Sequence, residues 1–285
     1  MKKEIINFLR CSQCHGENIS FRADILTCSK CGKKYPVVSE KIFYNEPPEI
    51  WPKSRNPNPS QPTGWSKLRK GEYKFTSKIL SEISPNSVIF DLGAGESHFR
   101  DLLSRFKEVL SVDLFPYQKI DVVADFTKEV PLRDSSGDIV VISNVLEHII
   151  EPQFFLNECV RVLKSGGTIV GTAPFLLWVH QEPYDYNRFT DFMLKHILEE
   201  AGFTDVRVES VVTPLDTLKG LTGRYFEVIK DNNKDGGVKL SVYDRIRLSL
   251  VLRLEGLQQR LLSAFSALPS SKIYTAGYGF TGRKK

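Results

Sequence analysis

The sequence predicts an α/β fold, in which an open and mostly parallel sheet carries helices on both faces and follows a small cysteine-rich module. From residue 65 onward, short apolar runs alternate with helical patterns, which is typical of parallel strands joined by right-handed crossovers. Four cysteines form two pairs near the start, and residues 45–64 contain six prolines, which exclude helix and central strand. A chain of 285 residues accommodates a module at 1–44, a linker at 45–64 and a main domain at 65–285.

The main domain divides into strands and helices by its apolar patterns. We expect strands at 88–90, 109–112, 122–123, 139–142, 168–172 and 206–212, with helices at 97–107, 145–149, 152–163 and 190–201. Thr190 is a plausible cap for the last of these helices, which ends before Gly202. Residues 240–268 carry apolar side chains at spacings of three and four, so a helical insertion is expected at about 214–268 before a final strand at 273–281.

Composition and charge narrow the class of protein. Hydrophobic residues make up 41% and charged residues 26%, as in ordinary globular proteins. The apolar patch at 5–9 is too short for a signal peptide, and no run approaches a membrane span, so a cytoplasmic protein is expected. Residues 76–210 are acidic, whereas both flanks are basic. The flanks either face an anionic partner, such as nucleic acid or a membrane surface, or serve solubility.

The cysteine module has the spacing of a zinc site. Its two Cys-x-x-Cys pairs place four thiolates on two tight turns, which completes a tetrahedron around Zn²⁺. Four thiolates leave no open coordination position, so the zinc is expected to be structural, and a redox dithiol would explain one pair only. Cys159 is expected to be a small buried hydrophobe and His15 a solvated neighbour of the site. The expected ligands are Cys11, Cys14, Cys28 and Cys31.

A glycine turn follows the first strand of the main domain, where an open α/β sheet places its ligand. Gly93, Ala94 and Gly95 let the backbone approach that ligand closely, and Asp91 precedes them. A dinucleotide-binding turn has a small third residue where this chain has His98, which would crowd a pyrophosphate. A carboxylate ahead of the glycines instead suits a cationic ligand, and S-adenosylmethionine (SAM) carries a sulfonium and an ammonium group.

Polar residues also follow the next three strands. Asp113, with Leu114 beside it, ends the second strand, where a carboxylate can accept hydrogen bonds from both ribose hydroxyls; a turn or helix cap is the alternative role. After the third strand, Asp125 can accept from an adenine amino group, and Phe126 can cover the adenine ring. Ser143 and Asn144 follow the fourth strand into the same site.

Together these motifs resemble the class I SAM-dependent methyltransferases, in the broad group related to quinone-biosynthesis enzymes. The resemblance covers roughly residues 86–210. It implies a Rossmann-like sheet of seven strands in the order 3-2-1-4-5-7-6, with the seventh antiparallel, and it implies SAM as cofactor without specifying the acceptor. The module at 1–44 resembles zinc ribbons of the tRNA-methyltransferase-activator type, including the run at 35–38 after the second cysteine pair.

The segment 174–190, after the fifth strand, lies where the methyl acceptor is expected. It has more aromatic and ionisable residues than a connector requires. His180 is the first candidate for a general base on an acceptor hydroxyl and His148 the second, although for any single histidine a structural role is the better explanation. The segment resembles a loop of methyltransferases from bacterial sugar and polysaccharide pathways. Four further residues either hold the acceptor or lock the loop to the domain: Tyr184, Asp185, Tyr186 and Arg188.

Three functions are compatible with these features. The leading hypothesis is methyl transfer to a small molecule or glycan, including a lipid-linked saccharide precursor. An RNA methyltransferase is the second, because a zinc ribbon and basic flanks suit nucleic acid, although no dense Arg/Lys cluster interleaved with aromatics occurs in the ribbon. The third is a non-catalytic scaffold that binds SAM. The basic helical pattern at 240–268 also permits contact with a membrane surface.

Overall fold

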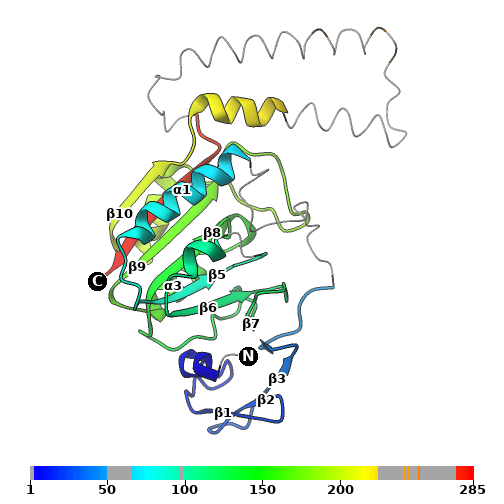
Figure 1. Ribbon diagram of the computed structural model, residues 1–285, viewed down its shortest axis with the longest axis vertical. Coiled ribbons are helices and arrows are strands. Elements are labelled where there is room, and N and C mark those ends of the chain that lie inside the picture. The colour runs from blue at the N-terminus through cyan, green and yellow to red at the C-terminus, as the bar shows by residue number, and fades with distance from the viewer. Residues whose placement is uncertain are drawn as a thin grey trace.

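The computed structural model describes residues 3–49, 66–96, 99–223 and 274–285, together with the single positions 241, 243 and 250 (Figure 1). The predicted linker from residue 50 onward lies outside these ranges. So does most of the predicted helical insertion, including nearly all of the apolar stripe at 240–268. Residues 214–223, at the start of that insertion, are helical. In the part of the chain that the structure describes, no helix is long and apolar enough to cross a bilayer.

Seven strands of the main domain have the predicted order. They run β7-β6-β5-β8-β9-β11-β10, and β11 is antiparallel to both of its neighbours. The order is therefore the 3-2-1-4-5-7-6 arrangement, with parallel pairing from β7 through β9. The bounds are β5 Val88–Leu92, β6 Glu108–Asp113, β7 Val122–Val123, β8 Gly137–Ser143, β9 Leu163–Pro174, β10 Phe203–Ser210 and β11 Gly277–Lys284.

The sheet is nevertheless larger than the seven strands predicted, because the ribbon extends it to eleven. β4 pairs parallel with β7 and places Ile42 opposite Val122. β7 is only two residues long, and the ribbon covers the sheet edge that it would otherwise leave open, as proteins commonly do. A 3₁₀ helix, η1 (Lys3–Phe8), precedes the ribbon strands β1 Ile19–Arg22, β2 Ile25–Cys28, β3 Lys34–Val38 and β4 Lys41–Phe43.

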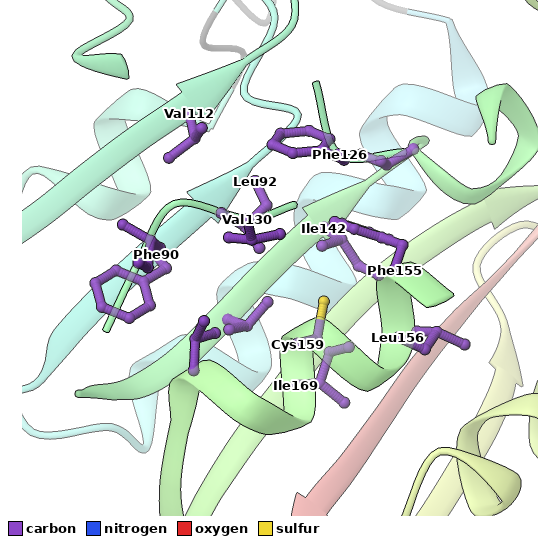
Figure 2. Close-up of a cluster of buried hydrophobic side chains, with 14 of the residues drawn as sticks. Phe90, Leu92, Val112, Phe126, Val130, Ile142, Phe155, Leu156, Cys159 and Ile169 are labelled. Carbon is purple, nitrogen blue, oxygen red and sulfur yellow. The ribbon is translucent and has the colours of Figure 1, made fainter. Parts of the chain in front are cut away.

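The alternation of side chains along the strands builds one core on each face. Ile89 of β5 packs with α1 (Lys67–Ser81) and α2 (Arg100–Leu103), whereas its neighbour Phe90 packs on the opposite face with α3 (Pro152–Val162) and α4 (Asp191–Glu200). Figure 2 shows part of the second core, with the Cys159 sulfur among apolar side chains. Cys159 is fully buried there, which confirms the prediction of a small buried hydrophobe.

The helices differ in detail from the patterns in the sequence. α4 begins after Thr190, whose hydroxyl accepts a hydrogen bond from the Met193 amide, as predicted. The helix expected at 97–107 is reduced to α2 over its described part, and the 145–149 helix is the 3₁₀ helix η2 (Leu146–His148). α1 was not predicted, although Ser66 caps it. Two glycines of β11, Gly277 and Gly279, leave room on the sheet for Leu68 and Phe75 of this helix.

The ribbon and the main domain share one core. Leu9 and Tyr35 of the ribbon belong to the same buried cluster as Phe90 of β5, and the Phe8 ring meets Phe90 edge-on at 5.9 Å. Buried Arg10 adds ion pairs across the junction, with its guanidinium 2.6 Å from Glu129 and 2.8 Å from Asp134. A ribbon fixed by both apolar and ionic contacts is an integral part of the folded sheet.

Candidate active site

The glycine turn lies at the carboxyl end of β5, beside the ends of β6 and β8. Gly93 has φ +76°, and a Cβ there would come within 2.3 Å of a Val145 methyl, so a side chain is excluded by conformation and by space. The Gly93 amide donates to the Val112 carbonyl at 2.8 Å. Ala94 and Gly95 continue the turn beyond the strand. The backbone at this carboxyl end of the sheet is therefore open to close approach by a ligand.

Two buried carboxylates flank this turn. Asp113 accepts hydrogen bonds from the amides of Gly95 at 2.8 Å and Phe115 at 2.9 Å, while Asp91 lies one strand away on β5. Burial, followed by the charge of Asp113, raises the pKa of Asp91 to about 7. Burial raises the pKa of Asp113 to about 6, against the amide hydrogen bonds from Phe115, Gly95 and Leu114. A cation beside the pair would favour the ionised form of both groups.

The end of β7 places the other predicted cofactor residues. Asp125 accepts from the Thr127 amide at 3.0 Å and lies 3.1 Å from the Lys128 amine, so its carboxylate caps the local turn. Its own amide donates to Asn45 Oδ1 at 2.7 Å, which connects the start of the predicted linker to this turn. Phe126 is buried and stacks on Phe155 at 5.2 Å, so one face of its ring is occupied by the core (Figure 2).

The end of β8 carries a second group of polar residues. Ser143 shares a hydrogen bond of 2.8 Å with Thr172, and Asn144 adopts a positive φ of 54° that turns the chain into η2. η2 then presents Glu147 and His148. Glu147 is fully buried, and burial raises its pKa to about 8, with the nearby Glu72 charge contributing.

The 174–190 segment folds back onto η2. The amides of Tyr186 and Asn187 donate to the Glu147 carbonyl at 2.8 and 3.1 Å. Arg188 makes a bidentate ion pair with Asp185 at 2.5 and 2.8 Å, and Asp185 also accepts from the His180 amide at 2.8 Å. Asp185 and Arg188 therefore hold the loop together internally.

This folding brings together the two candidate catalytic histidines. The rings of His148 and His180 lie 5.3 Å apart with their planes at 66°. The Tyr184 ring packs 6.0 Å from Phe115, which follows β6, while the Tyr186 side chain is 46% exposed. The histidine pair thus joins η2, which follows β8, to the loop predicted to receive an acceptor.

The four ribbon cysteines converge as predicted from their spacing. All four sulfurs lie within 4.8 Å of one another, with Cys11 and Cys31 3.5 Å apart and Cys14 and Cys28 3.6 Å apart. Zinc–thiolate bonds of about 2.3 Å in a tetrahedron require sulfurs about 3.8 Å apart, so this cluster fits Zn²⁺. The Tyr35 hydroxyl, 3.1 Å from the Cys11 sulfur, supplies an outer hydrogen bond of the kind that orients metal ligands.

Comparisons with known proteins bear on the segment that holds the glycine turn. Residues 90–171 match a family model described as a methyltransferase domain. A "probable S-adenosylmethionine-dependent methyltransferase" of Mycobacterium tuberculosis is 28% identical over 134 residues, which are 41% of this chain and 49% of that protein. The chain therefore spans about half the length of the curated relatives it matches.

The matched segment is therefore similar to the methyltransferase domains of SAM-dependent enzymes. Phosphoethanolamine N-methyltransferase 2 of Haemonchus contortus overlaps with 79% of the chain and 53% of its own length, at 19% identity and a TM-score of 0.48. A SAM-dependent methyltransferase of Archaeoglobus fulgidus overlaps with 76% of the chain and 94% of its own length, at 16% identity and a TM-score of 0.46. Similarity at this level carries no argument about the reaction.

Two residues of the candidate site were missed by sequence reasoning. Glu147 stands directly before His148 but was not assigned a role, and Glu72 lies on the unpredicted helix α1. A signal for Glu72 was available, because it falls on the same helical face as Leu68, Phe75 and Thr76, all of which are buried. A carboxylate on a buried stripe usually has a specific partner.

Proposed function

We propose that this protein transfers the methyl group of SAM to a small-molecule or glycan acceptor. The observation that carries the proposal is the pair of buried carboxylates, Asp91 and Asp113, around the glycine turn of the matched domain. In this proposal, Asp113 holds the ribose hydroxyls of SAM, and Asp91 supplies negative charge for the cationic end of the cofactor. SAM supplies an already activated methyl group, so alignment of the acceptor provides much of the rate.

The acceptor side of the proposal rests on the 174–190 loop and η2. Methyl transfer to a hydroxyl requires that the acceptor lose its proton, and the His148–His180 pair beside Glu147 lies where such a proton would be released. Exposed aromatic side chains at the same loop, Trp178 at 37% and Tyr186 at 46%, suit the apolar face of a sugar or another ring. The ribbon has a structural role in this proposal, with Zn²⁺ held by its four cysteines.

The test is to incubate the purified protein with methyl-labelled SAM and a bacterial extract, and then to separate RNA, lipid-glycan and small-molecule fractions. Label in the glycan or small-molecule fraction supports the proposal. Label that ribonuclease removes assigns the enzyme to RNA instead. SAM binding without label in any fraction contradicts catalysis on the acceptors present in the extract.

Replacement of His180 by alanine is expected to spare SAM binding and to reduce turnover by about 100-fold or more, because a positioned histidine beside the acceptor contributes roughly that factor. The measurements are the SAM dissociation constant by calorimetry and kcat with the acceptor found above. The exposed His196 on α4, whose side chain is 69% exposed, provides a matched control as His196→Ala. Normal turnover in the His180 variant would contradict the assignment.

SAM affinity is expected to weaken as pH falls from 8 to 6. The pKa values of Asp91, about 7, and Asp113, about 6, both lie above their ordinary range, so protonation removes charge from the cation site across this window. The loss should approach tenfold per pH unit for each group that must ionise. Calorimetry at pH 7 should also detect proton release on SAM binding, and Asp91→Asn should flatten the pH profile.

The raised pKa of Asp91 also predicts how the stability of the SAM-free protein depends on pH. A carboxyl with a raised folded-state pKa favours folding most when it is protonated, and this contribution is lost as pH rises through about 7. Asp91→Asn should therefore raise the unfolding temperature of the SAM-free protein at pH 8 while weakening SAM binding. An unchanged unfolding temperature would contradict the burial of an ionised Asp91.

A further inference from the structure

Three side chains bring possible metal-ligand atoms close together. Two of them follow β8, and the third comes from the 174–190 loop. Glu147 Oε1 lies 3.6 Å from His148 Nε2 and 3.8 Å from His180 Nε2. These atoms all lie within 4.8 Å of one another. Glu147 is fully buried, and both histidine side chains are largely enclosed, at 16% and 21% exposed.

The hydrogen bond of the His148 ring determines which of its nitrogens carries hydrogen. His148 Nδ1 lies 2.6 Å from the Tyr184 carbonyl oxygen, which can only accept, so Nδ1 is the donor and Nε2 keeps a lone pair. His180 Nδ1 lies 3.2 Å from Asp185 Oδ2, an acceptor, and 3.5 Å from the Arg188 guanidinium, a donor. The contact with Asp185 favours the tautomer that leaves the lone pair on Nε2, and the contact with Arg188 favours the other.

Two of the three groups, Glu147 and His148, have buried lone pairs that no donor within the described residues satisfies. Both oxygens of Glu147 and His148 Nε2 are buried without a hydrogen-bond partner, and so are both oxygens of Glu72 on α1. Glu72 is 1% exposed, and the Arg69 guanidinium lies 3.4 Å from one of its oxygens. Buried polar atoms are almost always paired, and an unpaired carboxylate is costly in a low-dielectric interior. A proton on Glu147 would supply one donor, enough for one imidazole only.

We propose that Glu147, His148 and His180 bind one divalent transition-metal ion. Two imidazole nitrogens and one carboxylate form a ligand set that suits such ions, and three protein ligands leave coordination positions open. The Tyr184 carbonyl and Asp185 hold the outer nitrogens of the two rings, which is the usual way a protein orients metal-bound histidines. Glu72, whose charge acts on Glu147, adds a second negative group toward the ion.

The role of the ion rests on the proposed methyl transfer. An acceptor hydroxyl bound at an open position would have its pKa lowered by the ion, and its proton would pass to water. In this arrangement the two histidines hold the ion instead of taking the proton themselves, and His180→Ala lowers turnover through loss of the ion. The acceptor oxygen then forms a bond to the methyl carbon as the carbon–sulfur bond breaks, and the sulfur keeps the bonding electron pair. The products are the methyl ether, S-adenosylhomocysteine and one proton. The substrate class is therefore an oxygen acceptor that can ligate a metal, rather than an amine.

Mn²⁺ is the probe for this site, because thiolates bind it poorly and the zinc-loaded ribbon will not compete for it. The full-length, zinc-loaded protein should bind one Mn²⁺ per chain in a titration followed by electron paramagnetic resonance. His148→Ala and His180→Ala should each weaken that binding by at least about 10-fold, the lower end of effects seen even for outer-shell partners. His196→Ala, on exposed α4, should leave it unchanged.

Two readouts keep the metal site separate from the proposed activity. SAM affinity, measured without Mn²⁺, should match wild type in the histidine variants, and thermal unfolding without Mn²⁺ shows that each variant is folded. Glu147→Gln provides a variant that keeps size and shape. No Mn²⁺ binding by the wild type, or equal binding by folded His148→Ala and His180→Ala proteins, overturns the site. Failure to bind SAM in the presence of normal Mn²⁺ binding would instead overturn the proposed methyltransferase activity.

Discussion

Removal of the ribbon metal is expected to lower the unfolding temperature of the whole described fold by on the order of 10 °C or more. One cysteine pair precedes β1 and the other lies at the turn between β2 and β3, and β4 then pairs with β7 of the main sheet. Ribbon and domain share one buried core, so loss of the ribbon fold exposes apolar surface on both sides. Calorimetric unfolding before and after chelation, and of Cys28→Ser, measures the effect.

The neighbouring His15 supplies the control for this experiment. Its side chain is 60% exposed, and it stands next to Cys14 without being needed for a four-thiolate site. His15→Ala should keep the metal and the unfolding temperature. Two separate transitions, with the methyltransferase domain unfolding at its original temperature after chelation, would show that the ribbon is energetically independent of the sheet.

Metal loss should also weaken SAM binding, through a defined contact. Asn45, two residues after β4, accepts the hydrogen bond of the Asp125 amide at 2.7 Å, at the end of the strand to which β4 is paired. A displaced β4 removes this contact and loosens the turn that carries Asp125. Asn45→Ala should reproduce the loss of affinity in part, with the ribbon metal retained.

Asp113→Ala is expected to abolish measurable SAM binding, with an affinity loss of at least about 100-fold. Hydrogen bonds to a charged group contribute about 1.5–3 kcal/mol each, and the two ribose hydroxyls would lose both of theirs. The same substitution removes the acceptor for the Gly95 and Phe115 amides, so the glycine turn also loses its support. Calorimetric titration with SAM and with S-adenosylhomocysteine measures the loss.

The control for Asp113 is Asp101→Ala, because Asp101 is exposed on α2 and no hydrogen bond or ion pair of its carboxylate is seen in the described structure. Asp113→Asn keeps one acceptor oxygen and should fall between wild type and Asp113→Ala. Wild-type SAM affinity in a folded Asp113→Ala protein would place the cofactor elsewhere and contradict the proposed function at its first step.

Local sequence patterns were sufficient for the parts of the fold that depend on neighbouring residues. The apolar runs located β5, β6, β7 and β8 to within two residues at each end, because a buried strand needs only its own side chains to be recognised. Thr190 marked the start of α4 through its cap. The paired cysteines predicted a converged cluster, because two tight turns already hold two sulfurs each.

Contacts between residues far apart in the sequence could not be predicted from local patterns. Pairing of β4 with β7 joins segments about 80 residues apart, and only the folded sheet shows that β7 leaves an edge for the ribbon to cover. α1 was missed because its apolar side chains pack against Gly277 and Gly279 of β11, which lie far away in the sequence, near its other end. Burial of Phe126 against Phe155 is likewise a tertiary result.

The sequence by itself determined a glycine turn with acidic neighbours, a four-cysteine module and an order of strands, because each rests on chemistry carried by consecutive residues. Only the tertiary structure decided that Glu147, His148 and His180 converge beside Glu72. Those four residues come from three separate segments, and the loop hydrogen bonds to the Glu147 carbonyl bring two of those segments together. Buried polar atoms without a hydrogen-bond partner are costly, and several atoms of these side chains are buried in this way. No local sequence pattern predicts that burial.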